Sequence, residues 1–168
     1  MLSPWFFRNV ISSTLNNSPF PDHDRAVQIL TATALHESMG LRYDQQLGGG
    51  PALGFFQMEP GTAADHLRWV CNNARASLWI GSVSIAPTTV LSKEHLQYDL
   101  PFQIALARVH YYTRSRLRLP DEQDIEAQAS YWKECYNTKK GRGKPEQFIQ
   151  SWMKYAPQDM RDNLGKIS

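Results

Sequence analysis

Apolar side chains recur at helical spacing along most of this chain, and prolines and glycines separate the resulting stripes. The stripes predict helices over 3–15, 24–39, 62–73, 89–97, 101–117, 121–136 and 145–155. Between them, 41–53 contains three consecutive glycines and a proline, which favours an irregular loop. No alternating run is long enough for the core of a sheet, although a small β-hairpin near 41–58 stays open. The pattern indicates a single, mostly α-helical domain over residues 1–168.

The ends of these helices follow from capping chemistry. We expect Asp22 or Asp24 to cap the start of the second helix and Gly40 to cap its end. Thr62 is the expected N-cap of the third helix, and residues 81–87 are expected to form a loop. The second helix then carries Glu37 in its last turn, where the negative end of the helix dipole disfavours ionisation of a carboxyl group.

The composition is that of an ordinary globular protein: 42% of the 168 residues are hydrophobic and 20% are charged. No apolar run approaches the roughly 18 residues that a membrane-spanning helix needs, so we expect no stable membrane insertion. Cys71 and Cys135 stand alone and are expected to be two buried thiols rather than a disulfide. The histidines show no metal-ligand spacing, so we expect neither a metal nor a cofactor.

Glu37 is the residue that points most directly to chemistry. It ends an apolar helix, and the segment 54–58 (GFFQM) follows seventeen residues later with a glycine hinge and a glutamine. A carboxyl group held in a partly dry pocket has a raised pKa and can protonate a leaving oxygen near neutral pH. This arrangement suggests glycoside cleavage. The alternative is a structural carboxylate paired with a helix-end arginine such as Arg42.

Three separated motifs carry a family resemblance. They are Glu37-Ser38, then the segment 54–57 (GFFQ), then Tyr136-Asn137 with Gly141 and Gly143 shortly after. Their order on a helical domain resembles the lysozyme-like superfamily of soluble lytic transglycosylases and goose-type lysozymes. The resemblance spans roughly residues 25–145.

The resemblance implies a role for each of these residues. Glu37 becomes the general acid, and Ser38 bonds the sugar or the backbone of the active site. Phe55, Phe56 and Gln57 line the cleft near the acetamido sugars. Tyr136 and Asn137 close its far wall and orient Glu37 or the substrate. The chain departs from the family pattern in Phe56, in Met39 before Gly40, and in the longer gap of 138–140 before the glycines.

A second carboxylate decides between two reactions. An inverting hydrolase needs a base that activates water, whereas a lytic transglycosylase uses one glutamate as acid and then as base while the muramic 6-hydroxyl attacks. Asp44 and Glu59 are the candidates for this base. Both muramidase and lytic transglycosylase chemistry remain open at this point.

The resemblance implies a peptidoglycan lysin that cuts the bond between N-acetylmuramic acid and N-acetylglucosamine, most economically a bacteriophage endolysin. The N-terminus has no basic region ahead of its apolar part, so we expect synthesis in the host cytoplasm without a signal peptide and holin-dependent release to the periplasm. The net charge of +2 suits approach to an anionic wall. We expect a monomer whose partner is the peptidoglycan glycan strand.

Two other functions compete with this one. The basic clusters at Arg114, Arg116 and Arg118 and at 139–144 (which holds Lys139, Lys140, Arg142 and Lys144) would suit a non-enzymatic nucleic-acid-binding helical protein. A degenerate lysozyme fold that binds glycan without cutting it is the other alternative. The nucleic-acid function does not explain the three motifs together, and we expect no nucleic-acid partner. Intact Glu37 and Gln57 speak against the degenerate fold.

Overall fold

The computed structural model describes residues 2–84, 91–115, 118–137 and 141–162. Within these residues it is built of helices, without a β-strand, which confirms the predicted mostly α class. The helices are α1 (Pro4–Leu15), α2 (His23–Glu37), α3 (Pro60–Cys71), α4 (Ala74–Val83), α5 (Lys93–Tyr98), α6 (Leu100–Arg114), α7 (Ile125–Cys135), α8 (Pro145–Tyr155) and α9 (Gln158–Asp162). The segment 41–58 forms isolated bridges, Gln45 with Leu53 and Leu53 with Met58, rather than a hairpin.

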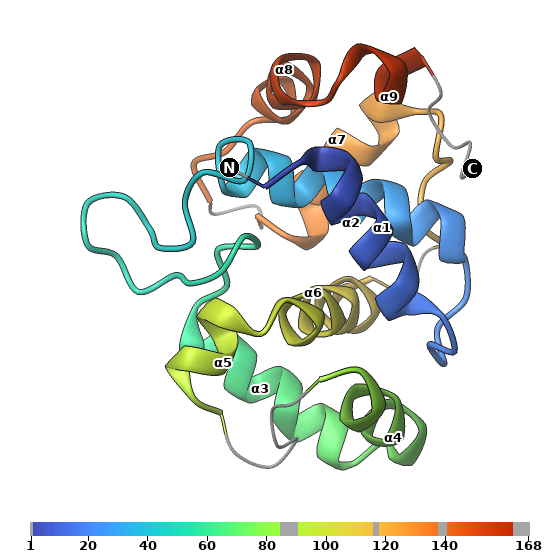
Figure 1. The fold of residues 1–168 in the computed structure, drawn as a ribbon, viewed down its shortest axis with the longest axis vertical. Helices are drawn as coiled ribbons and strands as arrows, with labels where there is room; N and C mark the ends of the chain where they lie inside the picture. Colours follow the sequence, from blue (N-terminus) through green and yellow to red (C-terminus); the bar gives the residue numbers. More distant parts are fainter. Residues whose placement is uncertain (1, 85–90, 116–117, 138–140, 163–168) are drawn as a thin grey trace.

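Helix α6 is the centre of the molecule (Figure 1). It packs against α1, α2 and α7 on one side and against α3, α4 and α5 on the other. Every residue from Phe102 to Tyr111 is buried, so this helix is covered around its whole circumference. Helix α2 is nearly as enclosed, since residues 26–35 are all buried beside α1, α6 and α8. Two buried helices therefore set the position of everything at their ends.

The predicted helices differ from the observed ones at both ends. The helices expected to end at 39, 73 and 117 end earlier, at Glu37, Cys71 and Arg114. Helix α3 begins with Pro60 in its first turn after Glu59, not after Thr62, because proline is preorganised for this position. Helix α7 begins after Asp124, whose side chain accepts from the Ala127 amide, rather than after Asp121. Helix α2 starts after Asp22 as predicted, but this residue has φ +62° and makes no side-chain cap bond.

Helix α4 is a feature that the pattern did not predict. The Asn73 side chain caps it by accepting from the Ala76 amide at 3.1 Å. The Trp79 indole anchors it by donating to the Thr14 carbonyl at 3.0 Å. Gly81, expected in a loop, lies in the last turn because tertiary packing outweighs its poor helix propensity. Helix α5, expected over 89–97, begins only at Lys93, because the Ser92 side chain caps it by accepting from the His95 amide at 3.1 Å. Residues 85–90 lie outside the described part of the chain.

The structure also bears on the expectations about the two cysteines and about membrane-spanning helices. Cys135 is buried, but Cys71 is exposed at the end of α3, so the expectation of two buried thiols is wrong for Cys71. Within the described residues, no helix combines the length and the apolar character that spanning a membrane requires.

Candidate active site

Glu37 is the last residue of α2, and an unusual helix end holds it there. The Gly40 amide bonds the Leu35 carbonyl at 2.8 Å and the Met39 amide bonds the His36 carbonyl at 3.3 Å, the pattern of a Schellman motif. Met39 occupies the left-handed position with φ +52°, where glycine is the usual residue. Gly40 follows with φ +79°, and a Cβ there would come within 2.6 Å of the Tyr155 ring. The tight turn therefore aims Glu37 away from the helix axis and toward the segment 43–59.

Burial removes much of the water around the Glu37 carboxyl group. Burial raises its pKa from 4.5 to about 7, and a hydrogen bond from the Trp132 indole to Glu37 Oε1, 2.9 Å long, opposes this rise. Within the described residues Glu37 makes no ion pair, and Arg42 is exposed. The structural alternative of an arginine-paired carboxylate is therefore contradicted. A carboxyl with this pKa is partly protonated at neutral pH and can donate a proton.

The segment 54–58 forms a compact turn opposite Glu37. Gly54 has φ +73°, and a Cβ there would lie 2.6 Å from the Gln103 side-chain oxygen, which accepts from the Phe55 amide. Gln57 also has positive φ, +46°, and its side-chain amide donates to the Gly54 carbonyl at 2.9 Å. The Tyr136 hydroxyl donates to the Phe56 carbonyl at 2.8 Å. This last bond ties the turn to the end of α7.

A glycine-containing turn follows α7 and closes round Asn137. The Lys133 ammonium donates to Asn137 Oδ1 at 2.9 Å and to the Gly141 carbonyl at 2.7 Å. Gly143 approaches the Trp132 ring so closely that a Cβ would lie 2.6 Å from it. A larger residue at this position would displace the ring that bonds Glu37. Residues 138–140, the longer gap noted in the sequence, lie outside the described residues.

These elements enclose a cleft of about 540 Å³, a size typical of small-ligand sites. Five of the predicted site residues line it, namely Glu37, Gln57, Glu59, Tyr136 and Asn137. Its remaining wall comes from polar and apolar side chains of the loop and from α3 and α6: Met39, Tyr43, Gln45, Gln46, Leu47, Ala52, Met58, Thr62, His110 and Arg114. Glu59 is thus the second-carboxylate candidate that shares a cleft with Glu37.

Four predicted site residues do not line this cleft. Ser38 is fully buried, and its hydroxyl bonds the Ala34 carbonyl and the Leu41 amide, so it serves the backbone rather than a ligand. Phe56 is 1% exposed, and both Phe55 and Phe56 contact Phe7 of α1. The Phe56 ring belongs to the core, and the partly buried Phe55 ring packs against it. The prediction that their side chains line the cleft is wrong.

Asp44 is also displaced from the site. Its carbonyl accepts from the Gly54 amide at 2.8 Å, which braces the loop, but its side chain is not part of the cleft wall. The candidate base drawn from its spacing after Glu37 is therefore not supported by its position.

Three residues of the site escaped sequence reasoning. Trp132 lies four residues before Tyr136, about one helical turn, so the two side chains leave the end of α7 on the same side. His110 and Arg114 lie four apart on α6, and both face the cleft. Arg114 could have been found as the last-turn residue of the helix between the second and third motifs. Its neighbours Arg116 and Leu117 are outside the described residues.

His110 belongs to a buried histidine pair. Its Nε2 donates to the Cys135 carbonyl at 3.1 Å, so its Nδ1 is free to accept from His66 Nε2 at 2.7 Å. Burial lowers the pKa of His66 to about 4 and that of His110 to about 3. His36, next to Glu37, bonds Ser151 and has its pKa lowered to about 4 by burial. These neutral rings place no positive charge beside Glu37.

The structure describes only part of the two basic clusters. Arg118 is bonded to Asp22 at 2.9 Å, and Arg114 faces the cleft. Arg142 and Lys144 are exposed, whereas Lys139, Lys140 and Arg116 lie outside the described residues.

No group of three metal-ligating side chains occurs among the described residues.

Comparison with family models, with curated proteins and with solved structures found no match to this chain.

Proposed function

We propose that this protein cleaves the β-1,4 bond between N-acetylmuramic acid and N-acetylglucosamine in peptidoglycan, with Glu37 as general acid. The observation that carries the proposal is a carboxyl of pKa about 7 on the wall of a 540 Å³ cleft. The amide groups of Gln57 and Asn137 and the phenol of Tyr43 line the same cleft, and such groups suit sugar hydroxyl and acetamido groups. The motif order supports the same substrate through its resemblance to lytic transglycosylases and goose-type lysozymes.

The chemistry begins with proton transfer from Glu37 to the glycosidic oxygen, which breaks the bond to C1 of the muramic sugar. Glu37 is left as a carboxylate. If the attacking group is the muramic 6-hydroxyl, Glu37 accepts its proton, an anhydro sugar forms and no second carboxylate is needed. If the attacking group is water, Glu59 is the carboxylate that shares the cleft and can accept the proton of the water. Biologically, the proposal is a monomeric bacteriophage endolysin that reaches the wall through holin lesions.

Mass spectrometry of the soluble products from purified peptidoglycan tests this proposal. We expect Glu37→Gln to reduce product release by a factor of about 10²–10⁴, the range for loss of a general acid. Glu59→Gln should have the same effect only in a hydrolase, and anhydromuropeptides would identify a transglycosylase instead. Asp44→Asn, whose side chain is outside the cleft, is the matched control. Wild-type release by Glu37→Gln would contradict the proposal.

The same preparations test the nucleic-acid alternative. Salt-dependent DNA binding that survives Glu37→Gln, without any release of wall fragments, would favour that function.

A further inference from the structure

A second pocket, of about 700 Å³, lies on the face of α6 away from the Glu37 cleft. Arg108, Tyr112 and Ser115 share this face because a helix turns by about 100° per residue, whereas His110 and Arg114 face the cleft. Trp69 of α3 and Tyr131 of α7 complete the wall. The glycosidase proposal uses none of these residues.

Part of the pocket wall is aromatic, since Trp69, Tyr111, Tyr112 and Tyr131 line it. Phe20, which is not a lining residue, packs behind these rings. Tyr112 lies 4.5 Å from the Phe20 ring and 5.9 Å from the Trp69 ring, measured between ring centroids. Phe20 in turn packs edge-on against Trp79 at 5.6 Å. Rings anchored in this way offer flat, preformed apolar faces to a ligand.

Arg108 is the unusual member of the pocket. It is 3% exposed, and its guanidinium carbon lies 5.2 Å from the Phe20 centroid and 6.0 Å from that of Tyr112. Its Nη2 donates to the Pro21 carbonyl at 2.9 Å. Burial lowers its pKa to about 10, still far above neutral pH, so the group is charged. A buried guanidinium is unfavourable unless an anion compensates it.

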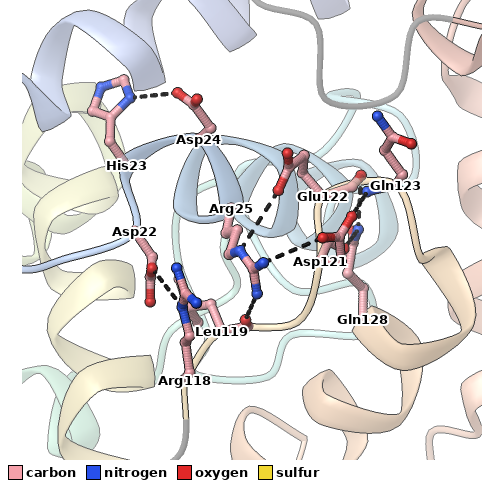
Figure 2. Close-up of polar contacts among 10 residues, drawn as sticks. All are labelled: Asp22, His23, Asp24, Arg25, Arg118, Leu119, Asp121, Glu122, Gln123 and Gln128. Carbon is pink, nitrogen blue, oxygen red and sulfur yellow. Dashed lines mark hydrogen bonds and ion pairs between the residues drawn. The ribbon is translucent and has the colours of Figure 1, made fainter.

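The described residues do not supply that anion fully. Asp22 is the carboxylate on the pocket wall, and its Oδ1 accepts from Arg118 Nε at 2.9 Å (Figure 2). Arg25, the next cation on α2, is occupied by Asp121 and Glu122 (Figure 2). No described carboxylate lies within ion-pair distance of Arg108. Among the described residues that line the pocket, two arginines thus share one aspartate, which leaves one positive charge without a matching carboxylate.

We infer that this pocket binds a monocarboxylate carried on a six-membered ring, with Arg108 pairing the carboxylate and Trp69 and Tyr112 contacting a face of the ring. The guanidinium, held in place by the Pro21 carbonyl, and the aromatic faces are already positioned for this ligand. The chemistry is shared by aromatic acids and by pyranose acids such as N-acetylmuramic acid. The inference does not depend on Glu37, and it stands or falls separately from the glycosidase proposal.

The test is a titration followed by the indole N–H signals of the five tryptophans, with the Trp69 signal assigned from Trp69→Phe. We expect benzoate to shift the Trp69 signal saturably and its neutral isostere benzamide to bind at least tenfold more weakly. Arg108→Met should abolish the benzoate shift, and Arg108→Lys should weaken it. Arg114→Gln, on the same helix but facing the other cleft, is the matched control and should leave it unchanged.

Titration with N-acetylmuramic acid beside N-acetylglucosamine separates the two sources. Tighter binding of the muramic acid than of benzoate identifies a wall-derived sugar acid, and the reverse order identifies a small aromatic acid. Equal affinity for benzoate and benzamide in the wild type would overturn the inference without relying on any variant. A Trp69 shift that persists in Arg108→Met, while the other indole signals stay native, would overturn it as well.

Discussion

At the scale of single residues, two opposing effects determine the pKa of Glu37. Burial raises its pKa to about 7, while the Trp132 indole stabilises the carboxylate. His36 packs edge-on against Trp132 at 4.6 Å and, being neutral, supplies no compensating charge. The pKa of Glu37 is therefore set by burial and by the indole hydrogen bond rather than by a charged partner. The direction in which a substitution shifts this pKa can be predicted from these two causes.

Glu37→Gln should stabilise the protein increasingly as pH rises. The folded pKa lies above the unfolded value, so the folded state binds more protons between pH 4.5 and about 7, and the contribution of Glu37 to stability falls as pH increases. Relative to wild type, the variant should gain on the order of 1–3 kcal/mol between pH 4.5 and pH 8. Urea denaturation at both pH values measures the difference, with the exposed Glu134→Gln as control. A difference independent of pH would contradict the raised pKa.

Trp132→Phe should move the Glu37 pKa still higher. The substitution removes the one described hydrogen bond that favours the charged carboxylate and leaves burial to act alone. Carboxyl-carbon NMR titration measures the shift directly, and Trp152→Phe on α8 controls for loss of a buried indole. An unchanged or lower pKa in Trp132→Phe would show that the indole does not stabilise the carboxylate.

At the scale of elements, the turn that ends α2 is the main feature of the site, because it follows the acid directly and contacts the end of α8. This Schellman turn places left-handed residues at Met39 and Gly40 directly after the acid. The same turn brings Gly40 against Tyr155 at the end of α8, so two helix ends meet beside the cleft. Tyr136 makes the corresponding link from the end of α7 to the 54–58 turn.

Gly40→Ala should destabilise the protein more than Gly48→Ala does. Both glycines have φ near +80°, so both substitutions cost about 1 kcal/mol in backbone conformation. Only at Gly40 does the added Cβ meet a ring, at 2.6 Å, whereas nothing lies within 4 Å at Gly48. We expect a further loss of about 1–3 kcal/mol at Gly40, measured by chemical denaturation. Equal losses at the two positions would show that Tyr155 moves aside freely.

At the scale of the whole molecule, α6 is shared by the two concave sites and by both halves of the helical core. On its cleft face, His110 is bonded to His66 of α3 and to the Cys135 carbonyl of α7, so this pair of histidines links the three helices. These rings are held neutral by burial, so their effect on stability depends on pH in the opposite sense to that of Glu37.

His66→Gln should destabilise the protein at pH 7 by about 1 kcal/mol, the value of a typical buried hydrogen bond. That deficit should shrink as pH falls. The folded pKa of His66, about 4, lies below the unfolded value of 6.5, so wild-type stability is lost between these values as the unfolded state takes up a proton. Urea denaturation at pH 7 and pH 5 compares the two proteins. A deficit that is constant with pH would show that His66 is not held neutral.

The helical class and most helix positions could be predicted because apolar stripes, prolines and caps act locally. The last helix, expected to follow the breaker at 141–145 and to run through Tyr155, is observed over Pro145–Tyr155. Helix α4 could not be predicted in the same way, since Trp79 finds its partner at Thr14, sixty-five residues away in the chain. Glu37, Gln57 and Tyr136 line one cleft, whereas the Phe56 side chain is buried in the core, because motif spacing does not reveal which way a ring points.

By itself, the sequence determined where helices can form and that Glu37 would sit in the last turn of one of them, since spacing, capping and helix breaking depend on neighbours in the chain. Only the tertiary structure decided that Trp132 bonds the acid, that Ser38 and Phe56 turn inward, and that Arg108 lies buried on the far face of α6. Burial and hydrogen bonding between distant segments make these differences, and both arise only when the helices pack together.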